Sequence, residues 1–357
     1  MPQRFIFIKS LAICIIFASV FAVYNWAFTP YSCATPNTIY ISAGAFGNLF
    51  DEHPFIGNTQ ISCARLKKYL NAHEYNVQQI KNARYLANPQ AILFFDIYTN
   101  LLDLQAYPLD KRVLFLWEPP TTIEIGYKKE NHQYFSRIYT WNDDLVDNKK
   151  YFKFYYPQPT LKMVETAPDY AAKKLCTLIG CNKHSYYSHE LYSERKKAIE
   201  FFETEHPESF EFYGVGWDPN QYKTYKGTIK DKIEYLKKYK FSICYENASN
   251  LNGYITEKIF DCFVAGCIPI YWGAPNIAAY IPKSCFIDRR DFNSLQELYA
   301  HLISIDRTRY QEYLTNIATF LKSKDAQLFS SDHFITTVFG AACPNHTSMP
   351  DPKYATA

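Results

Sequence analysis

Residues 241–274 read FSICYENASNLNGYITEKIFDCFVAGCIPIYWGA, and they carry the clearest fold signal in the chain. Its beginning, Phe241 to Tyr245, is mostly aromatic or aliphatic, which is typical of a buried strand. After a polar loop, apolar side chains recur at helical spacing through residues 254–265, and Gly266 stands where a C-terminal cap belongs. Residues 268–272 predict a second buried strand. Together these segments predict a βαβ unit of a parallel sheet, whose ligand site lies at the loop leaving a strand's carboxyl end.

The start of the predicted helix carries the side chains with the most chemistry. Glu257 and Lys258 stand next to each other there, close in sequence to Tyr254 and Asn247. Free backbone N–H groups at a helix N-terminus, together with a lysine, favour a phosphate. A neighbouring carboxylate would be a poor phosphate ligand but a good acceptor for sugar hydroxyls. The residues therefore suggest a nucleotide sugar, and spacing alone leaves open that Glu257 and Lys258 are a solvated pair on a helix face.

A longer segment carries a resemblance to a known family. Residues 245–282 read YENASNLNGYITEKIFDCFVAGCIPIYWGAPNIAAYIP. They closely resemble the donor-binding motif of the α1,3/α1,4-fucosyltransferases (glycosyltransferase family 10), whose members share (F/Y)EN, (D/G)Y(I/V)TEK(I/L) and G.(I/V)P(I/V)Y.G in that order. Nearly every fixed position is present, and the resemblance covers most of the chain after residue 35. It implies the α/β GT-B fold, in which two Rossmann-like domains face a central cleft.

The resemblance also implies an activity, namely an inverting fucosyltransferase that moves L-fucose from GDP-fucose to a hydroxyl of an N-acetyllactosamine-type or other N-acetylglucosamine-containing glycan. Linkage, α1,3 or α1,4, is left open. Five residues are assigned to the donor by this likeness: Arg195, Asn247, Tyr254, Glu257 and Lys258. Two alternatives remain: a GT-B glycosyltransferase that uses a different nucleotide sugar, and a membrane-anchored, non-catalytic glycan-binding protein.

Glu118 is the candidate catalytic base. It directly follows the apolar run VLFLW at residues 113–117 and precedes Pro119 and Pro120. The prolines end the strand and hold the next segment extended, so the carboxylate is presented at the rim of the sheet. In the resembling family, a Glu before a Pro-containing turn at this point is the proposed general base, and Glu118 is the match. An ordinary exposed Glu is the alternative reading, and Glu124 is the nearest rival.

The resemblance places Arg195 at the diphosphate. The family has a strand, a small polar turn and an Arg entering a helix, where the Arg binds the diphosphate, and Arg195 fits that place. The turn here is longer than in many members, so Lys183 is an alternative for the inward-pointing cation. A surface Arg among charged helix neighbours is as well supported by the sequence alone.

The pair Asp143 and Asp144 resembles a metal-binding motif only superficially. The manganese-binding Asp-x-Asp of other glycosyltransferases has another pattern and another fold, so we interpret both as turn or acceptor-site residues. The 10 cysteines lack zinc-ligand spacing, and the 9 histidines show neither metal nor triad spacing. We therefore predict no metal site and no required cofactor, with a divalent metal at most stimulatory. A net charge of +3 gives no sign of a nucleic-acid partner.

At 357 residues the chain is long enough for two domains. Strands alternating with helices predict an α/β domain in each half. We predict an anchor and stem at 1–35, an acceptor-binding domain at 36–160, a linker at 161–172, a GDP-fucose-binding domain at 173–343 and a tail at 344–357.

The N-terminus predicts a membrane anchor. Arg4 and Lys9 precede residues 10–50, which carry no charge. The apolar core at residues 10–23 has the size of a signal-peptide core, whereas a span needs about 20 residues. Residues 5–28 reach that length if Lys9 snorkels. No small-residue cleavage site follows, so we predict an uncleaved single-pass anchor with a cytoplasmic N-terminus, Golgi-type in a eukaryote or in the bacterial inner membrane or envelope. A removed signal peptide is the alternative.

Overall fold

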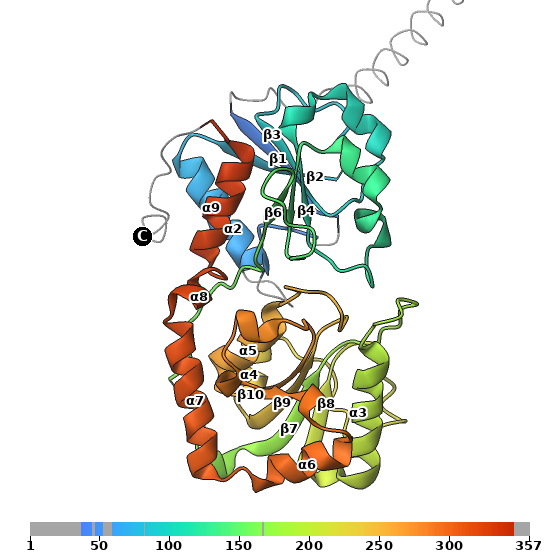
Figure 1. Ribbon diagram of the computed structural model, residues 1–357, viewed down its shortest axis with the longest axis vertical. Helices are drawn as coiled ribbons and strands as arrows, with labels where there is room; N and C mark the ends of the chain where they lie inside the picture. Colours follow the sequence, from blue (N-terminus) through green and yellow to red (C-terminus); the bar gives the residue numbers. More distant parts are fainter. Residues whose placement is uncertain (1–36, 45–46, 53–58, 82, 166–167, 346–357) are drawn as a thin grey trace, which may run out of the picture.

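The computed structural model describes residues 37–44, 47–52, 59–81, 83–165 and 168–345. The predicted anchor at 1–35 lies outside these residues, as does most of the predicted tail. None of the helices in this described part is long and apolar enough to cross a membrane. Two parallel sheets, one from each half of the chain, lie one above the other in Figure 1.

The first sheet has six parallel strands in the order β2-β1-β3-β4-β5-β6. Their bounds are β1 Thr38–Ser42, β2 Asn76–Ile80, β3 Ala91–Phe95, β4 Arg112–Leu116, β5 Arg137–Thr140 and β6 Tyr151–Lys153. Every residue of β1, β3 and β4 is buried because both faces of the sheet are covered. Helix α2 (Thr59–Ala72) contributes to the core on one face. The opposite face packs against a segment with four short 3-10 helices: η1 Leu101–Ala106, η2 Leu109–Lys111, η3 Glu124–Tyr127 and η4 Lys129–Tyr134.

The second sheet has five parallel strands in the order β11-β10-β9-β7-β8. Its strands are β7 Lys174–Ile179, β8 Phe210–Tyr213, β9 Tyr239–Tyr245, β10 Ile268–Trp272 and β11 Ile287–Asp288. The α-helices of this half are α3 Tyr192–Glu205, α4 Lys232–Leu236, α5 Glu257–Ala265, α6 Leu295–Ser304, α7 Arg307–Leu321 and α8 Lys324–Gln327. Short 3-10 helices complete the half: η5 Tyr170–Ala172, η6 Pro207–Ser209, η7 Ile277–Ala279, η8 Lys283–Cys285 and η9 Arg289–Asp291.

The predicted βαβ unit is confirmed as β9, α5 and β10. The two strands pair in parallel, with Ile243 opposite Ile270. Gly266 ends α5 in the left-handed conformation at φ 64°, as a C-terminal cap requires. The helix begins at Glu257, later than the predicted 254, because Thr256 is its N-cap and is itself extended. The three residues before Glu257 therefore form a loop rather than a helical turn.

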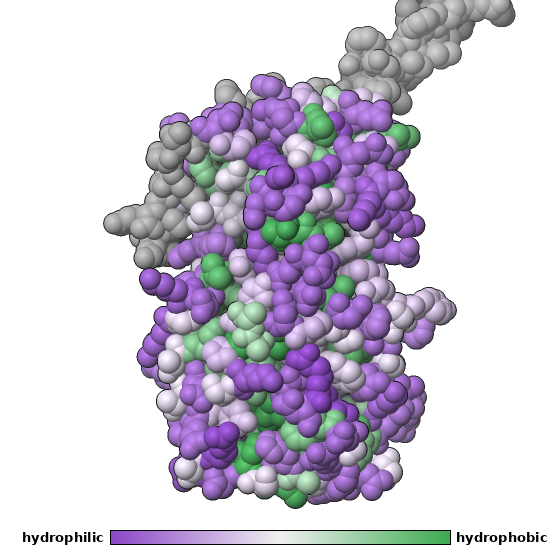
Figure 2. All heavy atoms as spheres, in the orientation of Figure 1, coloured by the Kyte–Doolittle hydropathy of each residue, from purple (hydrophilic) through white to green (hydrophobic). Residues whose placement is uncertain are grey.

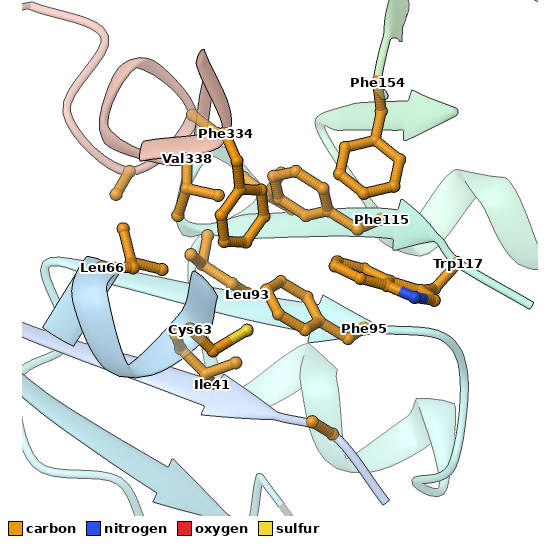
Figure 3. Packing of buried hydrophobic residues seen from close by; sticks show 14 of the residues in the cluster. Ile41, Cys63, Leu66, Leu93, Phe95, Phe115, Trp117, Phe154, Phe334 and Val338 are labelled. Carbon is orange, nitrogen blue, oxygen red and sulfur yellow. The ribbon is translucent and has the colours of Figure 1, made fainter. Parts of the chain in front are cut away.

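The last described helix, α9 (Ser331–Ala342), packs on the first sheet rather than the second. Figure 1 shows it beside α2, and Figure 3 shows Phe334 and Val338 over the aromatic side chains of β3 and β4. The domain range predicted from the sequence, 173–343, includes this helix in the second domain. In the structure the helix packs with the first domain. A helical pattern in a sequence does not say which sheet will cover its apolar face.

Most of the described cysteines are buried, and the face shown in Figure 2 is mainly polar. The eight cysteines among the described residues are free, and seven are buried, as the apolar surroundings of many cysteines predict. Figure 2 shows hydrophilic residues over most of one face, with small scattered apolar patches. The apolar side chains lie mainly in the cores above and below each sheet.

Candidate active site

A cavity of about 770 Å³ opens between the two sheets, at the carboxyl ends of their strands. It is lined by residues of both halves, including all six predicted site residues: Glu118, Arg195, Asn247, Tyr254, Glu257 and Lys258. Lys183 lines it as well. Glu124, the rival for the base, lies in η3 outside the lining, with its side chain 79% exposed and 3.6 Å from Lys128. The geometry therefore favours Glu118 over Glu124.

The backbone at Glu118 is fixed by a buried carboxylate. Asp96 directly follows β3 and adopts a left-handed φ of 64°. It accepts the N–H of Trp117 at 2.7 Å and the N–H of Glu118 at 3.0 Å. Asp96 therefore ties the end of β3 to the end of the neighbouring strand β4. Sequence reasoning missed it, and the signal available was an acidic residue placed directly after a fully apolar strand.

Three aromatic side chains fix the carbonyl groups of the same two residues. The Trp117 carbonyl accepts hydrogen bonds from the Trp141 indole N–H at 3.0 Å and from the Tyr156 hydroxyl. The Glu118 carbonyl accepts the Tyr127 hydroxyl at 2.7 Å. With both N–H groups and both carbonyls bound, this short segment is held rigidly, and the Glu118 carboxylate faces the cavity from a fixed backbone.

The surroundings make Glu118 a stronger base. Burial raises the pKa of the Glu118 carboxyl above its ordinary value, and this effect outweighs the opposing positive charge of Lys258. The nearby negative charge of Glu257 adds to the rise, and Lys183 partly offsets it. A carboxylate with a raised pKa accepts a proton more readily near neutral pH, as a general base requires.

On the opposite side of the cavity, Glu246 organises the start of α5. It directly follows β9 and is completely buried. One carboxylate oxygen accepts the Thr256 N–H at 2.8 Å, and the other accepts the Lys258 ammonium at 3.0 Å. The Thr256 hydroxyl also donates to this carboxylate. Sequence reasoning assigned Glu246 only to the polar loop, although it too directly follows an apolar strand.

The start of α5 therefore differs from the expected open helix N-terminus. Glu246 takes the Thr256 N–H, and the Thr256 hydroxyl accepts the Lys258 N–H at 3.4 Å. Since protein acceptors occupy these groups, the positive charge available to a phosphate comes mainly from side chains. The Lys258 ammonium donates to Glu246 and to the Thr256 hydroxyl, each at 3.0 Å, which leaves one of its three N–H donors for a ligand.

Lys258 and Glu257 both remain charged. Burial alone would lower the pKa of Lys258, but the carboxylates of Glu246 and Glu257 outweigh it and raise the pKa. Burial would likewise raise the pKa of Glu257, but Lys258 and Lys232 lower it to about 2. The Lys232 ammonium lies 3.8 Å from Glu257 and 2.8 Å from Asp261. No sequence pattern assigned a role to Lys232, which also lines the cavity.

Arg195 is largely occupied in shaping the loop after β9. Its Nη2 donates to the carbonyls of Tyr245 and Glu246, both at 2.7 Å, and to the Asn247 amide oxygen at 2.9 Å. Its guanidinium also lies over the Tyr192 ring at 5.1 Å. The Nη1 atom of Arg195 has no hydrogen-bond partner among the described residues. Arg195 therefore holds Asn247 in place and offers one terminal nitrogen to the cavity that it lines.

Tyr254 connects the loop before α5 to the first domain. Its ring is buried and lies 4.6 Å from the Trp141 ring and 6.2 Å from the Tyr156 ring, measured between centroids. Trp141 and Tyr156 also bind the Trp117 carbonyl beside Glu118. The same two aromatic residues thus support both sides of the cavity. In the part of the chain that the structure describes, no group of three or more His, Cys, Asp or Glu residues is arranged to hold a metal ion.

The fold and the place of the cavity define the class of protein. Two Rossmann-like sheets with a cleft at their carboxyl ends form the GT-B glycosyltransferase architecture. A crystal structure described as alpha1,3-fucosyltransferase with GDP shares this fold with a TM-score of 0.53 at 16% identity. That match covers 89% of this chain and 94% of the other.

Sequence comparisons add similarities within one family. The family model for glycosyltransferase family 10 (fucosyltransferase) C-term matches residues 186–353. An alpha-(1,3)-fucosyltransferase of Helicobacter pylori is 42% identical over 69 residues, which are 19% of this chain and 14% of that protein. An alpha-(1,4)-fucosyltransferase of Arabidopsis thaliana is 38% identical over 80 residues, which are 22% of this chain and 20% of that protein. The aligned parts thus span a fifth or less of these relatives. The part of the chain from residue 186 to residue 353 is therefore similar to the C-terminal part of glycosyltransferase family 10.

Proposed function

We propose that this protein is an inverting fucosyltransferase. It transfers L-fucose from GDP-fucose to a hydroxyl of an N-acetylglucosamine-containing glycan, in α1,3 or α1,4 linkage. One observation carries the proposal: Glu118 from the first domain and the Glu257–Lys258 pair from the second line the same cavity. A volume of about 770 Å³ is also within the ordinary range for small-molecule sites and suits a nucleotide sugar. The family 10 match and the GDP named with the similar crystal structure support the choice of donor.

The reaction follows from the charges on the two sides of the cavity. Glu118 accepts the proton of the acceptor hydroxyl while that oxygen forms a bond to the anomeric carbon of fucose. The bond from this carbon to the diphosphate breaks on the opposite face, so the configuration inverts and GDP leaves. The leaving group gathers negative charge, which the Lys258 ammonium and the Arg195 guanidinium stabilise.

The remaining donor residues orient the nucleotide sugar. Glu257 stays ionised because Lys258 and Lys232 lower its pKa to about 2 against the effect of burial, so it accepts hydrogen bonds from ribose hydroxyls. Asn247, held by Arg195, and Tyr254, packed against Trp141, position the phosphates or the fucose. In this scheme no step requires a cofactor, and a divalent metal is at most stimulatory. The predicted anchor at residues 1–35 would keep the enzyme at a membrane.

The direct test measures GDP release from GDP-fucose with and without N-acetyllactosamine, followed by linkage analysis of the product. GDP-mannose and a panel of UDP-sugars serve as competing donors, and Glu118→Gln serves as the inactive control. We expect acceptor-dependent release with GDP-fucose as the preferred donor. Preference for another donor would replace the proposal with a different glycosyltransferase on this scaffold. Glycan binding without release from any donor would indicate a non-catalytic binding protein.

A further inference from the structure

Asp143 stands outside the cavity lining, yet it is one of the most heavily bound carboxylates at the junction of the two domains. It lies in the turn after β5 and accepts the ammonium of Lys153 at 2.5 Å. It also accepts the Tyr280 hydroxyl at 2.6 Å and the Asn276 amide N–H at 2.7 Å. Tyr280 and Asn276 belong to the second domain, 137 and 133 residues further along the chain. We call these four residues the Asp143 cluster.

The Asp143 cluster forms hydrogen bonds with residues 252–253, in the loop before α5. The Asn276 amide oxygen accepts the Gly253 N–H at 2.8 Å, and the Asp143 N–H donates to the Asn252 carbonyl at 3.1 Å. The loop fits closely, because a Cβ added to Gly253 would lie 2.3 Å from the Trp141 carbonyl oxygen and 2.8 Å from an Asp143 carboxylate oxygen. Gly253 also has a φ of 77°, which favours glycine.

The negative charge of Asp143 is stabilised within the Asp143 cluster. Burial would raise the pKa of Asp143, but the hydrogen bonds from Lys153, Tyr280 and Asn276 outweigh it and lower the pKa. Lys153 also donates to the Trp141 carbonyl at 2.7 Å and to the Tyr280 hydroxyl at 3.0 Å. Its side chain is 19% exposed and that of Asp143 is 26% exposed, so water screens the pair only partly. An ion pair with these additional hydrogen bonds holds a defined geometry.

We propose that Asp143 is a positioning residue for the donor site, contributed by the opposite domain. Its cluster holds residues 252–253, so that Tyr254 packs on Trp141 and the segment ending in Lys258 faces the cavity. Donor affinity then depends on contact between the two domains, and opening of this contact loosens the donor site. The inference deepens the proposed function and rests on it for the identity of the donor.

The test compares GDP affinity, by titration calorimetry, among the wild type, Asp143→Asn and Tyr280→Phe. Asp143→Asn removes the charge but keeps the shape, and we expect GDP to bind about tenfold more weakly, because charge-assisted hydrogen bonds contribute more than neutral ones. Tyr280→Phe removes one donor and is expected to weaken binding about threefold. The double variant should weaken binding by less than the product of the two, since both act through one cluster.

The matched control is Asp144→Asn in the same turn. Asp144 accepts a single exposed hydrogen bond from the Asn252 side chain at 3.0 Å, so we expect GDP affinity within about twofold of the wild type. Thermal unfolding of each variant separates positioning from stability. A lowered Tm with unchanged GDP affinity in both Asp143→Asn and Tyr280→Phe would overturn the inference. If Asp143→Asn fails to fold, the Tyr280→Phe result decides in the same way.

The readout is chosen so that the two proposals fail separately. GDP binding that depends on Asp143, without fucose transfer to any acceptor, would remove the proposed fucosyltransferase activity and keep the positioning role. Fucose transfer with an unchanged GDP affinity in Asp143→Asn would remove the positioning role and keep the proposed fucosyltransferase activity. In steady-state kinetics, the positioning role predicts a raised KM for GDP-fucose in Asp143→Asn with a smaller change in kcat.

Discussion

The two sides of the cavity are built in different ways. On the donor side, most of the residues that carry chemistry lie between Glu246 and Lys258, and Arg195 reaches this segment from α3. On the base side, Glu118 depends on Asp96, Tyr127, Trp141 and residues further along the chain. The donor side is therefore built mainly around a motif, whereas the base side is a product of the folded sheet. The family model accordingly matches residues 186–353, which include the motif but not Glu118.

The largest expected effect comes from removing the base. In Glu118→Gln, kcat should fall by about 100- to 10,000-fold, because the amide cannot accept the acceptor proton. GDP affinity should stay within about twofold, since the diphosphate is held on the other side of the cavity. Steady-state kinetics and calorimetry check the two parts. A Glu118→Gln variant with more than a tenth of wild-type kcat would remove Glu118 from the chemistry, and Glu124→Gln would then be tested in its place.

On the donor side, removing Lys258 should lower both kcat/KM and the free energy of unfolding. Lys258→Ala removes one stabilising cation and should lower kcat/KM by about 100-fold. It also leaves the fully buried Glu246 without its ion-pair partner, which should lower the free energy of unfolding by about 3 kcal/mol. Lys196→Ala on the outer part of α3, where the side chain is 52% exposed, is the control and should change neither quantity. Unchanged turnover in Lys258→Ala would contradict the phosphate role.

Asp96 tests whether the base side depends on long-range support. Asp96→Asn keeps Oδ1, which accepts the Trp117 N–H at 2.7 Å, but places an NH2 group where Oδ2 accepts the Glu118 N–H at 3.0 Å. The Glu118 N–H then keeps only its longer contact of 3.2 Å to Oδ1. We expect kcat to fall about tenfold with unchanged GDP affinity. The exposed Asp110→Asn is the control. Equal loss of kcat and GDP affinity would show that the support is not specific to the base side.

The smallest effect is a shift in pH dependence. Glu118 must be ionised to accept a proton, so kcat/KM should rise as the pH passes through its pKa, which burial raises above the ordinary value. Lys183 lowers that pKa, and its removal in Lys183→Gln should move the acid limb to higher pH by about a few tenths of a unit, since Lys183 is exposed and its charge is screened. Lys149→Gln should leave the limb in place. A shift to lower pH in Lys183→Gln would contradict the electrostatic account.

Much of the fold follows from local pattern. The bounds of β10 agree with the sequence expectation because its apolar run begins and ends sharply. The start of α5 does not, since Thr256 caps the helix and Glu246 binds the cap from a distance of ten residues. The packing of α9 on the first sheet depends on the folded arrangement of both domains, which periodicity alone does not encode.

The site could be predicted where its residues form a motif or follow a strand. Glu257 and Lys258 were visible as a pair, and Glu118 was visible as an acidic residue after an apolar run. Asp96 and Glu246 also directly follow buried strands, so the same rule could have found them. Lys232 and the Asp143 contacts had no such signal, because they depend on the approach of distant segments.

The most direct test of the central claim is a crystal structure of the Glu118→Gln variant with GDP-fucose bound, in which turnover is suppressed. We expect the diphosphate within about 3 Å of the Lys258 ammonium, the ribose hydroxyls at Glu257, and residue 118 facing the anomeric carbon from the opposite side. A nucleotide bound away from Lys258, or a fucose with residue 118 on the same face as the diphosphate, would contradict it.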